Sequence, residues 1–154
     1  MSTPSRKKVI DLFIYRISRE GEFELLLLRR SQSKVYAGQW RMIGGKVEQG
    51  ETCWQAALRE MHEETGLSAK KFWSVPTVNH FYEPSTDTLH LIPVFAADTG
   101  LASEPKLDAE HSEYKWVSVT EADRLLEWPE QRRIVSVIEE IVMRRNILQE
   151  WFVE

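Results

Sequence analysis

Cysteine is almost absent from this sequence, and its scarcity sets the first limit on the class of protein. Cys53 is the one cysteine among 154 residues, so no disulfide can form within the chain. Small secreted domains depend on several disulfides, whereas proteins of reducing compartments do without them. We therefore expect the chain to be cytoplasmic.

Long apolar runs and an excess of positive charge are missing as well. No run approaches the roughly 18 apolar residues that cross a bilayer, and the N-terminal stretch MSTPSRKKVIDLF has no signal-peptide pattern. Twenty Lys and Arg stand against 24 Asp and Glu, for a net charge of −4. Since nucleic-acid backbones select basic surfaces, we expect neither a membrane nor a nucleic-acid polymer as a partner.

What is present fits one globular domain over residues 1–154. Hydrophobic residues make up 42% and charged residues 29%, which is ordinary for such a domain. The chain has no repeat, low-complexity segment or linker, and it is long enough to bury a core. The apolar residues 151–153 pack either on the domain itself or on a second copy, so a monomer and a homodimer both remain open.

Runs of β-branched and aromatic residues predict a series of strands. The expected strands are 8–17, 22–30, 39–43, 70–83, 88–97 and 113–117. The first two form a hairpin, and Gly44-Gly45 ends the third. Pro76 and Pro93 predict a bulge or an edge position in the two long strands.

Three segments have helical features. The stretch 52–65 begins with Thr52 as a cap and stops at Gly66. Ser118 to Glu121 matches a capping box before a short helix. A final helix is expected over about 130–149, with apolar residues at helical spacing at Ile134, Ile138, Ile141, Val142 and Leu148. Together these elements predict an α/β (α+β) fold, a mixed sheet with helices on both sides.

Three carboxylates share one face of the helix over 52–65. Glu60, Glu63 and Glu64 stand at i, i+3 and i+4, within roughly 100° of one another. Like charges at this spacing repel, so the face is either solvated or neutralised by a cation. Oxygen ligands favour hard ions, and Mg²⁺ or Mn²⁺ is the expected cofactor.

A glycine pair precedes this helix. Gly44-Gly45 allows a tight turn and lets a ligand approach the main chain, and Lys46 follows where it can reach a phosphate. Helix starts favour anions, because their first amides lack internal partners. A glycine loop followed by a carboxylate helix therefore predicts a site that pairs a metal with phosphate.

Residues 45–67 resemble the Nudix box, G-x5-E-x7-R-E-U-x-E-E-x-G-U, in which U is a bulky aliphatic residue. The matching residues are Gly45, Glu51, Arg59, Glu60, Met61, Glu63, Glu64, Gly66 and Leu67. The resemblance implies a Nudix-type α/β/α sandwich. It also implies a hydrolase that cleaves a diphosphate linkage in a small nucleotide-like molecule.

The resemblance assigns a role to each matching position. Glu60, Glu63 and Glu64 would be metal ligands, with the carbonyl of Gly44 completing a site. Arg59 would hold a catalytic glutamate by ion pairing. The remaining positions would support the loop structurally, namely Gly45, Glu51 and Gly66.

A second segment extends the likeness. Residues 110–116, EHSEYKW, resemble the E-H-x-x-Y-x-W segment of two Nudix subgroups. One contains the dATP and dihydroneopterin triphosphate pyrophosphohydrolases, and the other the asymmetric diadenosine tetraphosphate hydrolases. By this match Glu110 would be a further metal ligand or the general base; the alternative is a solvated loop glutamate. The carboxylate that takes the proton from water is then either Glu110 or one of Glu60, Glu63 and Glu64.

Substrate selection must come from outside the box. The cationic candidates for the phosphates are Arg29, Arg30, Arg41 and Lys46. The candidates for stacking on a base are Tyr36, Trp40, Phe81 and Tyr82. A tyrosine near position 82 resembles diadenosine polyphosphate hydrolases, whereas a proline near position 84 resembles ADP-ribose pyrophosphatases. Four functions therefore remain open: a nucleoside triphosphate pyrophosphohydrolase, a diadenosine polyphosphate hydrolase, an ADP-ribose pyrophosphatase and a non-catalytic binding module.

Overall fold

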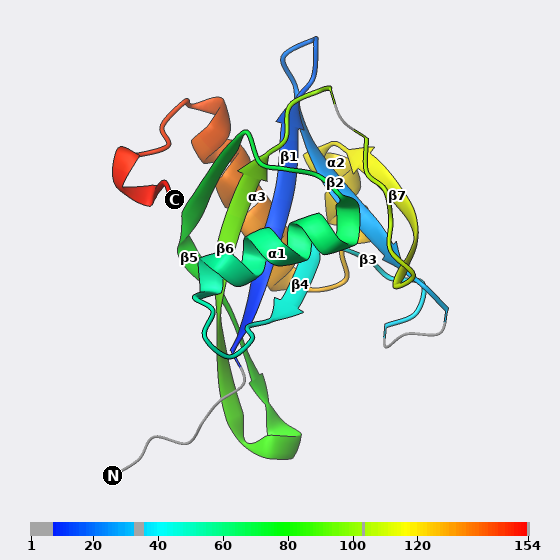
Figure 1. The fold of residues 1–154 in the computed structure, drawn as a ribbon, viewed down its shortest axis with the longest axis vertical. Helices are drawn as coiled ribbons and strands as arrows, with labels where there is room; N and C mark the ends of the chain where they lie inside the picture. Colours follow the sequence, from blue (N-terminus) through cyan, green and yellow to red (C-terminus); the bar gives the residue numbers. More distant parts are fainter. Residues whose placement is uncertain (1–7, 33–35, 103, 154) are drawn as a thin grey trace.

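The computed structural model describes residues 8–32, 36–102 and 104–153. Within these ranges one mixed sheet has helices on both faces, as the sequence predicts (Figure 1). The strands are β1 (Val9–Ile17), β2 (Phe23–Arg30), β3 (Trp40–Arg41), β4 (Ile43–Lys46), β5 (Lys71–Glu83), β6 (Thr88–Asp98) and β7 (His111–Val117). The helices are α1 (Cys53–Thr65), α2 (Val119–Leu125) and α3 (Pro129–Met143), with 3₁₀ turns η1 (Pro84–Thr86) and η2 (Gln149–Trp151). None of the helices described is long and apolar enough to span a bilayer.

The segment that contains β3 and β4 lies between β2 and β1 and positions the glycine pair. The strand order is β3-β2-β1-β6-β5, with β4 paired to β1 and β7 to β2. β1 and β2 pair near Tyr15 and Leu25, then diverge, and β3 bonds to β2 while β4 bonds to β1. The expected strand over 39–43 is therefore wrong in detail. It is interrupted at Met42 and continues through both glycines to Lys46.

Apolar residues on the two faces of the sheet form two separate cores. On β1, Ile10, Leu12 and Ile14 pack with Ala57 and Met61 of α1. The alternate residues of β1 face the other way, into the core beneath α2 and α3. That second core contains Phe13, Tyr15, Leu25, Leu27, Ala122, Ile134, Val135 and Ile138. Because both faces are covered, most of β1 and β2 is buried.

The long β5–β6 hairpin confirms the strands expected over 70–83 and 88–97. Its register shifts between Ser74 and Val78, around Pro76, and Val78 pairs with Pro93. The prolines thus occupy the irregular part of the ladder, where a missing amide costs least. Beyond this point the hairpin extends past the rest of the sheet (Figure 1).

Local signals define α1 at both ends. The Thr52 side chain accepts from the amide of Gln55, and the Gln55 side chain accepts from the amide of Thr52. At the other end Gly66 adopts φ 68°, a left-handed conformation that glycine enters without steric cost. These two residues fix the helix that carries the three carboxylates.

The expected end of the last helix is wrong. α3 stops at Met143, because Arg145 adopts a left-handed conformation with φ 53°. The amides of Arg145 and Asn146 bond back to the carbonyls of Val142 and Ile141, which is a Schellman motif. Since no glycine stands at this position, no local pattern predicts where the helix ends. Leu148 therefore lies outside the helix and is exposed.

The chain after α3 folds back onto β5. Trp151 stacks on the buried Trp73, with ring centroids 6.3 Å apart. Phe152 forms a bridge with Trp73, and the amide of Val153 donates to the carbonyl of Phe72. Within the described chain, the apolar residues 151–153 thus contact the domain itself.

We predict that Trp151→Ala lowers the free energy of unfolding by about 2 kcal/mol, because it removes a half-buried aromatic ring and its stacking contact. Chemical denaturation monitored by circular dichroism measures this change. Glu150→Ala is the matched control, since Glu150 is exposed and adjacent. Equal stability of the two variants would show that the folded-back segment does not contribute.

Candidate active site

Gly44 and Gly45 bring the backbone of β4 against the acidic helix. A Cβ atom at Gly45 would lie 2.5 Å from Cγ of Glu60, closer than atoms can approach. At Gly44 the nearest atom would be Oδ1 of Asp11, at an acceptable 3.7 Å. Neither glycine has a positive φ. Gly45 is therefore required for space rather than for backbone conformation.

Arg59 ties the loop to the helix. Its Nε and Nη2 donate to the two carboxylate oxygens of Glu51, at 2.8 and 3.1 Å. Nη1 donates to Glu60 at 2.8 Å and to Glu63 at 3.1 Å. Nη2 also donates to the carbonyl of Lys46. One planar guanidinium thus fixes three carboxylates and the loop backbone.

Glu51 closes the loop that leads into α1. Its Oε1 accepts from the amide of Glu48 at 2.9 Å as well as from Arg59. The hydrogen bonds from Arg59 hold the pKa of Glu51 below its usual value. Glu51 and Arg59 therefore make the contact that their box positions imply.

The three carboxylates of α1 differ in exposure, although they share one face. The Glu63 side chain is 55% exposed and that of Glu60 16%, while the Glu64 side chain is 4% exposed. Burial, followed by the negative charge and the side-chain hydrogen bond of Glu60 and then by the charges of Asp108 and Glu110, raises the pKa of Glu64 well above its usual value. Its Oε2 is buried and accepts no hydrogen bond from the residues described.

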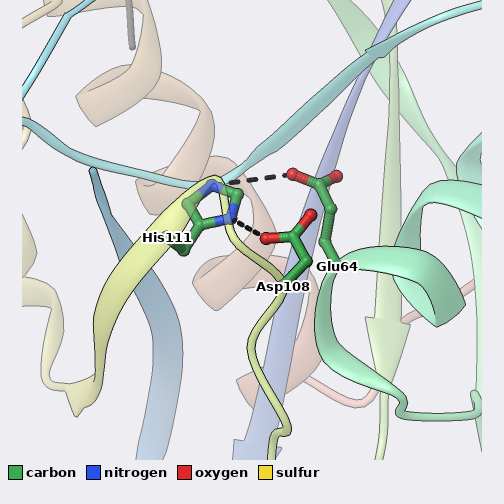
Figure 2. Close-up of side chains that lie close together, drawn as sticks. All are labelled: Glu64, Asp108 and His111. Atoms are coloured by element: carbon green, nitrogen blue, oxygen red, sulfur yellow. Dashed lines mark hydrogen bonds and ion pairs between the residues drawn. The ribbon is translucent and has the colours of Figure 1, made fainter. Parts of the chain in front are cut away.

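Asp108 and His111 complete the surroundings of Glu64 (Figure 2). His111 is the first residue of β7, and Nε2 of its buried ring lies 3.6 Å from Oε1 of Glu64. Nδ1 of the same ring lies 2.9 Å from Oδ1 of Asp108. Sequence reasoning assigned neither residue a role. His111 stands next to Glu110 in the downstream motif, and that position was the one available signal.

Glu110 comes from the loop before β7. Its charge is one of those that act on Glu64, so it belongs to the same acidic group. Arg30 approaches it, with Nη1 3.8 Å from Oε2. The backbone carbonyl of Glu110 accepts from the amide of Ser31, which fixes this loop beside the end of β2.

The residues present fit a divalent cation. Glu60, Glu63, Glu64 and Glu110 provide oxygen donors of the kind that Mg²⁺ and Mn²⁺ prefer. An ion beside the orphaned Oε2 of Glu64 would supply the partner that a buried carboxylate otherwise lacks.

A second group of residues combines a cation with aromatic rings. The guanidinium of Arg41 lies over the ring of Tyr36 at 4.8 Å. Tyr36 meets Trp128 edge to face, with centroids 6.4 Å apart, and Trp128 also contacts Phe81 at 5.9 Å. Tyr36 and Trp128 are both partly exposed, so their rings are accessible to a ligand. Trp128 was not among the expected residues.

Asp11 lies between the aromatic group and the glycine pair, because it pairs with Gly44 and its carboxyl group is near the charge of Arg41. It pairs with Gly44 in the sheet and accepts from Nδ2 of Asn79 at 2.7 Å. Burial raises the pKa of Asp11 to about 6, against the opposing effects of Asn79 and the nearby positive charge of Arg41. Nε of Arg41 is buried without a partner in the described part of the chain.

Other expected substrate residues lie elsewhere. Trp40 packs against the core beneath α2 and α3. Tyr82 lies near the turn of the projecting β5–β6 hairpin, where its hydroxyl donates to Asp87. Lys46 lies within the box; its side chain is exposed, and its backbone carbonyl accepts a hydrogen bond from Arg59. The structure thus groups Tyr36, Phe81 and Arg41, and places Trp40 and Tyr82 outside that group.

A glycine loop followed by a carboxylate-bearing helix, packed on a mixed sheet, is the loop–helix–loop arrangement that defines Nudix domains. The chain belongs to the Nudix family, since residues 7–138 match the family model described as NUDIX domain.

Two curated relatives differ in how much of their length this chain matches. The asymmetrical bis(5'-nucleosyl)-tetraphosphatase of Sus scrofa is 30% identical over 119 residues, 73% of this chain and 76% of that protein. An octanoyltransferase of Myxococcus xanthus is 30% identical over 129 residues, 79% of this chain. That match covers 34% of the octanoyltransferase, so the chain spans about a third of its length.

Solved structures show the same fold. A crystal structure of a C. elegans Ap4A hydrolase binary complex superimposes with a TM-score of 0.74 at 23% identity. The likeness covers 89% of this chain and 98% of that one. The α/β/α sandwich expected from the box is therefore confirmed.

We predict that Gly45→Ala lowers divalent-metal affinity at least tenfold while the domain stays folded, because the new Cβ displaces the flexible end of Glu60. Isothermal titration with Mn²⁺ measures the affinity, and circular dichroism measures the fold. Gly44→Ala is the matched control, since its Cβ meets ordinary van der Waals distances and the substitution keeps the backbone carbonyl. Similar Mn²⁺ affinities in both variants would contradict a metal role for Glu60.

Proposed function

We propose that this protein is a pyrophosphohydrolase that uses Mg²⁺ or Mn²⁺ to cleave a diphosphate linkage in a nucleoside triphosphate or a related nucleotide. The observation that carries this proposal is the buried carboxylate of Glu64, whose Oε2 has no described partner. It lies within an acidic group that Arg59 organises from the neighbouring turn. A purely structural helix face has no need to bury a carboxyl group whose oxygen accepts no hydrogen bond.

The proposed ligands are Glu60, Glu63, Glu64 and the carbonyl of Gly44, with Glu110 adjacent. A divalent ion held there supplies Lewis acidity and lowers the pKa of a coordinated water. Arg59 orients Glu60 and Glu63, to which it donates directly. Glu110 is the proposed general base, which accepts the proton as the water oxygen bonds to phosphorus. The bridging P–O bond then breaks and releases two phosphate-bearing products.

Two groups of residues are proposed to hold the substrate. Lys46 is exposed at the end of the glycine strand, where it can pair with a phosphate oxygen. Arg41 precedes Lys46 in the chain, at the end of β3, and its guanidinium lies over Tyr36. The exposed parts of Tyr36 and Trp128 offer aromatic surface on which a base can stack. Phosphate and base would then lie on either side of the glycine pair.

A dinucleoside tetraphosphate is the second candidate substrate. Two observations favour it: the 30% identity to the Sus scrofa tetraphosphatase and the structural likeness to the C. elegans Ap4A hydrolase. Both comparisons cover more than two thirds of this chain and of the protein compared. The reaction chemistry would be the same and the leaving group would differ.

Metal removal tests the proposed activity. We expect EDTA to abolish hydrolysis and added Mg²⁺ or Mn²⁺ to restore it. Glu64→Gln should reduce turnover more than about 100-fold, because the loss of even an indirect partner of a metal ligand typically costs 10–100-fold. Glu113→Gln is the control, since Glu113 forms an exposed ion pair with Arg29. Undiminished turnover in Glu64→Gln would refute the assignment.

Product analysis separates the two candidate substrates. A nucleoside triphosphate pyrophosphohydrolase converts dATP to dAMP and pyrophosphate, whereas an asymmetric tetraphosphatase converts diadenosine tetraphosphate to ATP and AMP. Ion-exchange chromatography with dATP, dihydroneopterin triphosphate, diadenosine tetraphosphate and ADP-ribose resolves these products. We expect the highest kcat/KM with one of the first three. No product from any of the four would favour a non-catalytic binding module.

A further inference from the structure

Glu64, Asp108 and His111 form a compact group that includes a nitrogen donor (Figure 2). One potential ligand atom from each residue lies within 4.8 Å of those of the other two. The side chains of Glu64 and His111 are 4% and 2% exposed. Glu64 and His111 therefore lie inside the domain, between the last turn of α1 and the start of β7, and the Asp108 side chain, 27% exposed, borders them.

Asp108 fixes the orientation of the histidine ring. Its Oδ1 lies 2.9 Å from Nδ1 of His111 and also accepts from the amide of Glu110. With the proton on Nδ1 donated to this carboxylate, Nε2 of the neutral ring carries a lone pair. Histidines that bind metals usually donate their other ring N–H to a carboxylate or carbonyl in this way.

The spacing between Nε2 of His111 and Oε1 of Glu64 suits two ligands of one ion. At 3.6 Å it is too long for a hydrogen bond. Two ligand atoms that each lie about 2.1 Å from a metal are about 3.4 Å apart in a tetrahedral arrangement, which is close to the observed spacing. Independently, Oε2 of Glu64 is buried and has no partner among the described residues. Both observations indicate that a ligand belongs beside this carboxylate.

We propose that Nε2 of His111 and the carboxylate of Glu64 bind one first-row transition-metal ion, with Asp108 orienting the ring. The inference rests on the proposed function, because Glu64 is shared with the carboxylate site. It goes further in assigning a nitrogen ligand that the box does not contain. Imidazole suits transition metals, whereas Mg²⁺ is bound mainly through oxygen. The site should therefore prefer Mn²⁺ to Mg²⁺.

Pulsed electron paramagnetic resonance of the Mn²⁺-loaded protein tests the nitrogen ligand directly. We expect ¹⁴N modulation from a coordinated nitrogen in the wild-type protein. Labelling with ¹⁵N-histidine should replace it with the ¹⁵N pattern, and this measurement needs no substitution. Bound Mn²⁺ without nitrogen coupling would overturn the inference.

Substitutions locate the coupling. His111→Gln should abolish it and lower Mn²⁺ affinity about tenfold or more, while Mg²⁺ affinity falls less. Asp108→Asn should keep the coupling but weaken Mn²⁺ binding, because the ring is held less firmly. His80→Gln is the matched control, since the His80 side chain is exposed and its Nδ1 lies 3.5 Å from Oε2 of Glu130. Persistence of the coupling in a folded His111→Gln variant would overturn the assignment.

Failure of this inference is distinguishable from failure of the proposed function. Metal-dependent hydrolysis without nitrogen coupling leaves the carboxylate site standing and removes His111 from it. If Mn²⁺ does not bind and no substrate is cleaved with any divalent ion, both proposals fall together.

Discussion

The geometry of the candidate site depends on the hydrogen bonds and ion pairs that the guanidinium of Arg59 makes. It joins Glu51 in the loop, Glu60 and Glu63 on the helix, and the backbone of Lys46 at the end of β4. Three carboxylates so close together repel one another. A single cation with several fixed donors offsets that repulsion and sets the direction of each carboxylate at the same time.

The position of α1 on the sheet depends on apolar packing and not on Arg59. α1 is held on the sheet by small and flexible side chains, Ala56, Ala57 and Met61, which allow close approach. This approach brings Glu60 against Gly45 and turns Glu64 inward. The acidic helix is therefore amphipathic, but its buried side includes a carboxyl group as well as apolar residues. Of its three carboxyl groups, that of Glu64 is on the buried side, and those of Glu60 and Glu63 are oriented by Arg59.

Local sequence signals predicted the part of the site that is local in sequence. The capping residues Thr52 and Gly66 mark both ends of α1, and the i, i+3, i+4 spacing places the carboxylates on one face. The contact between Glu51 and Arg59 follows from the box. These features need little beyond one loop and one helix, so a pattern in the sequence is sufficient to find them.

The remainder depends on tertiary structure that no local pattern encodes. Asp108 and His111 reach Glu64 because β7 pairs with the far edge of β2, which neither spacing nor composition reveals. Trp128 joins Tyr36 and Phe81 across three separate segments. The end of α3 was missed because an arginine occupies the left-handed position at which glycine is usual.

The difference between local and distant contacts has a consequence for folding order. The Arg59 network spans one loop and one helix, so it closes a short stretch of chain at little entropic cost. The contact of Glu64 with His111 requires β7 to pair with β2, which makes it a contact of high sequence separation. A ligand that bridges these two residues would bind only the completed fold. By mass action it would stabilise the native state against the unfolded chain and join the first half of the domain to the second.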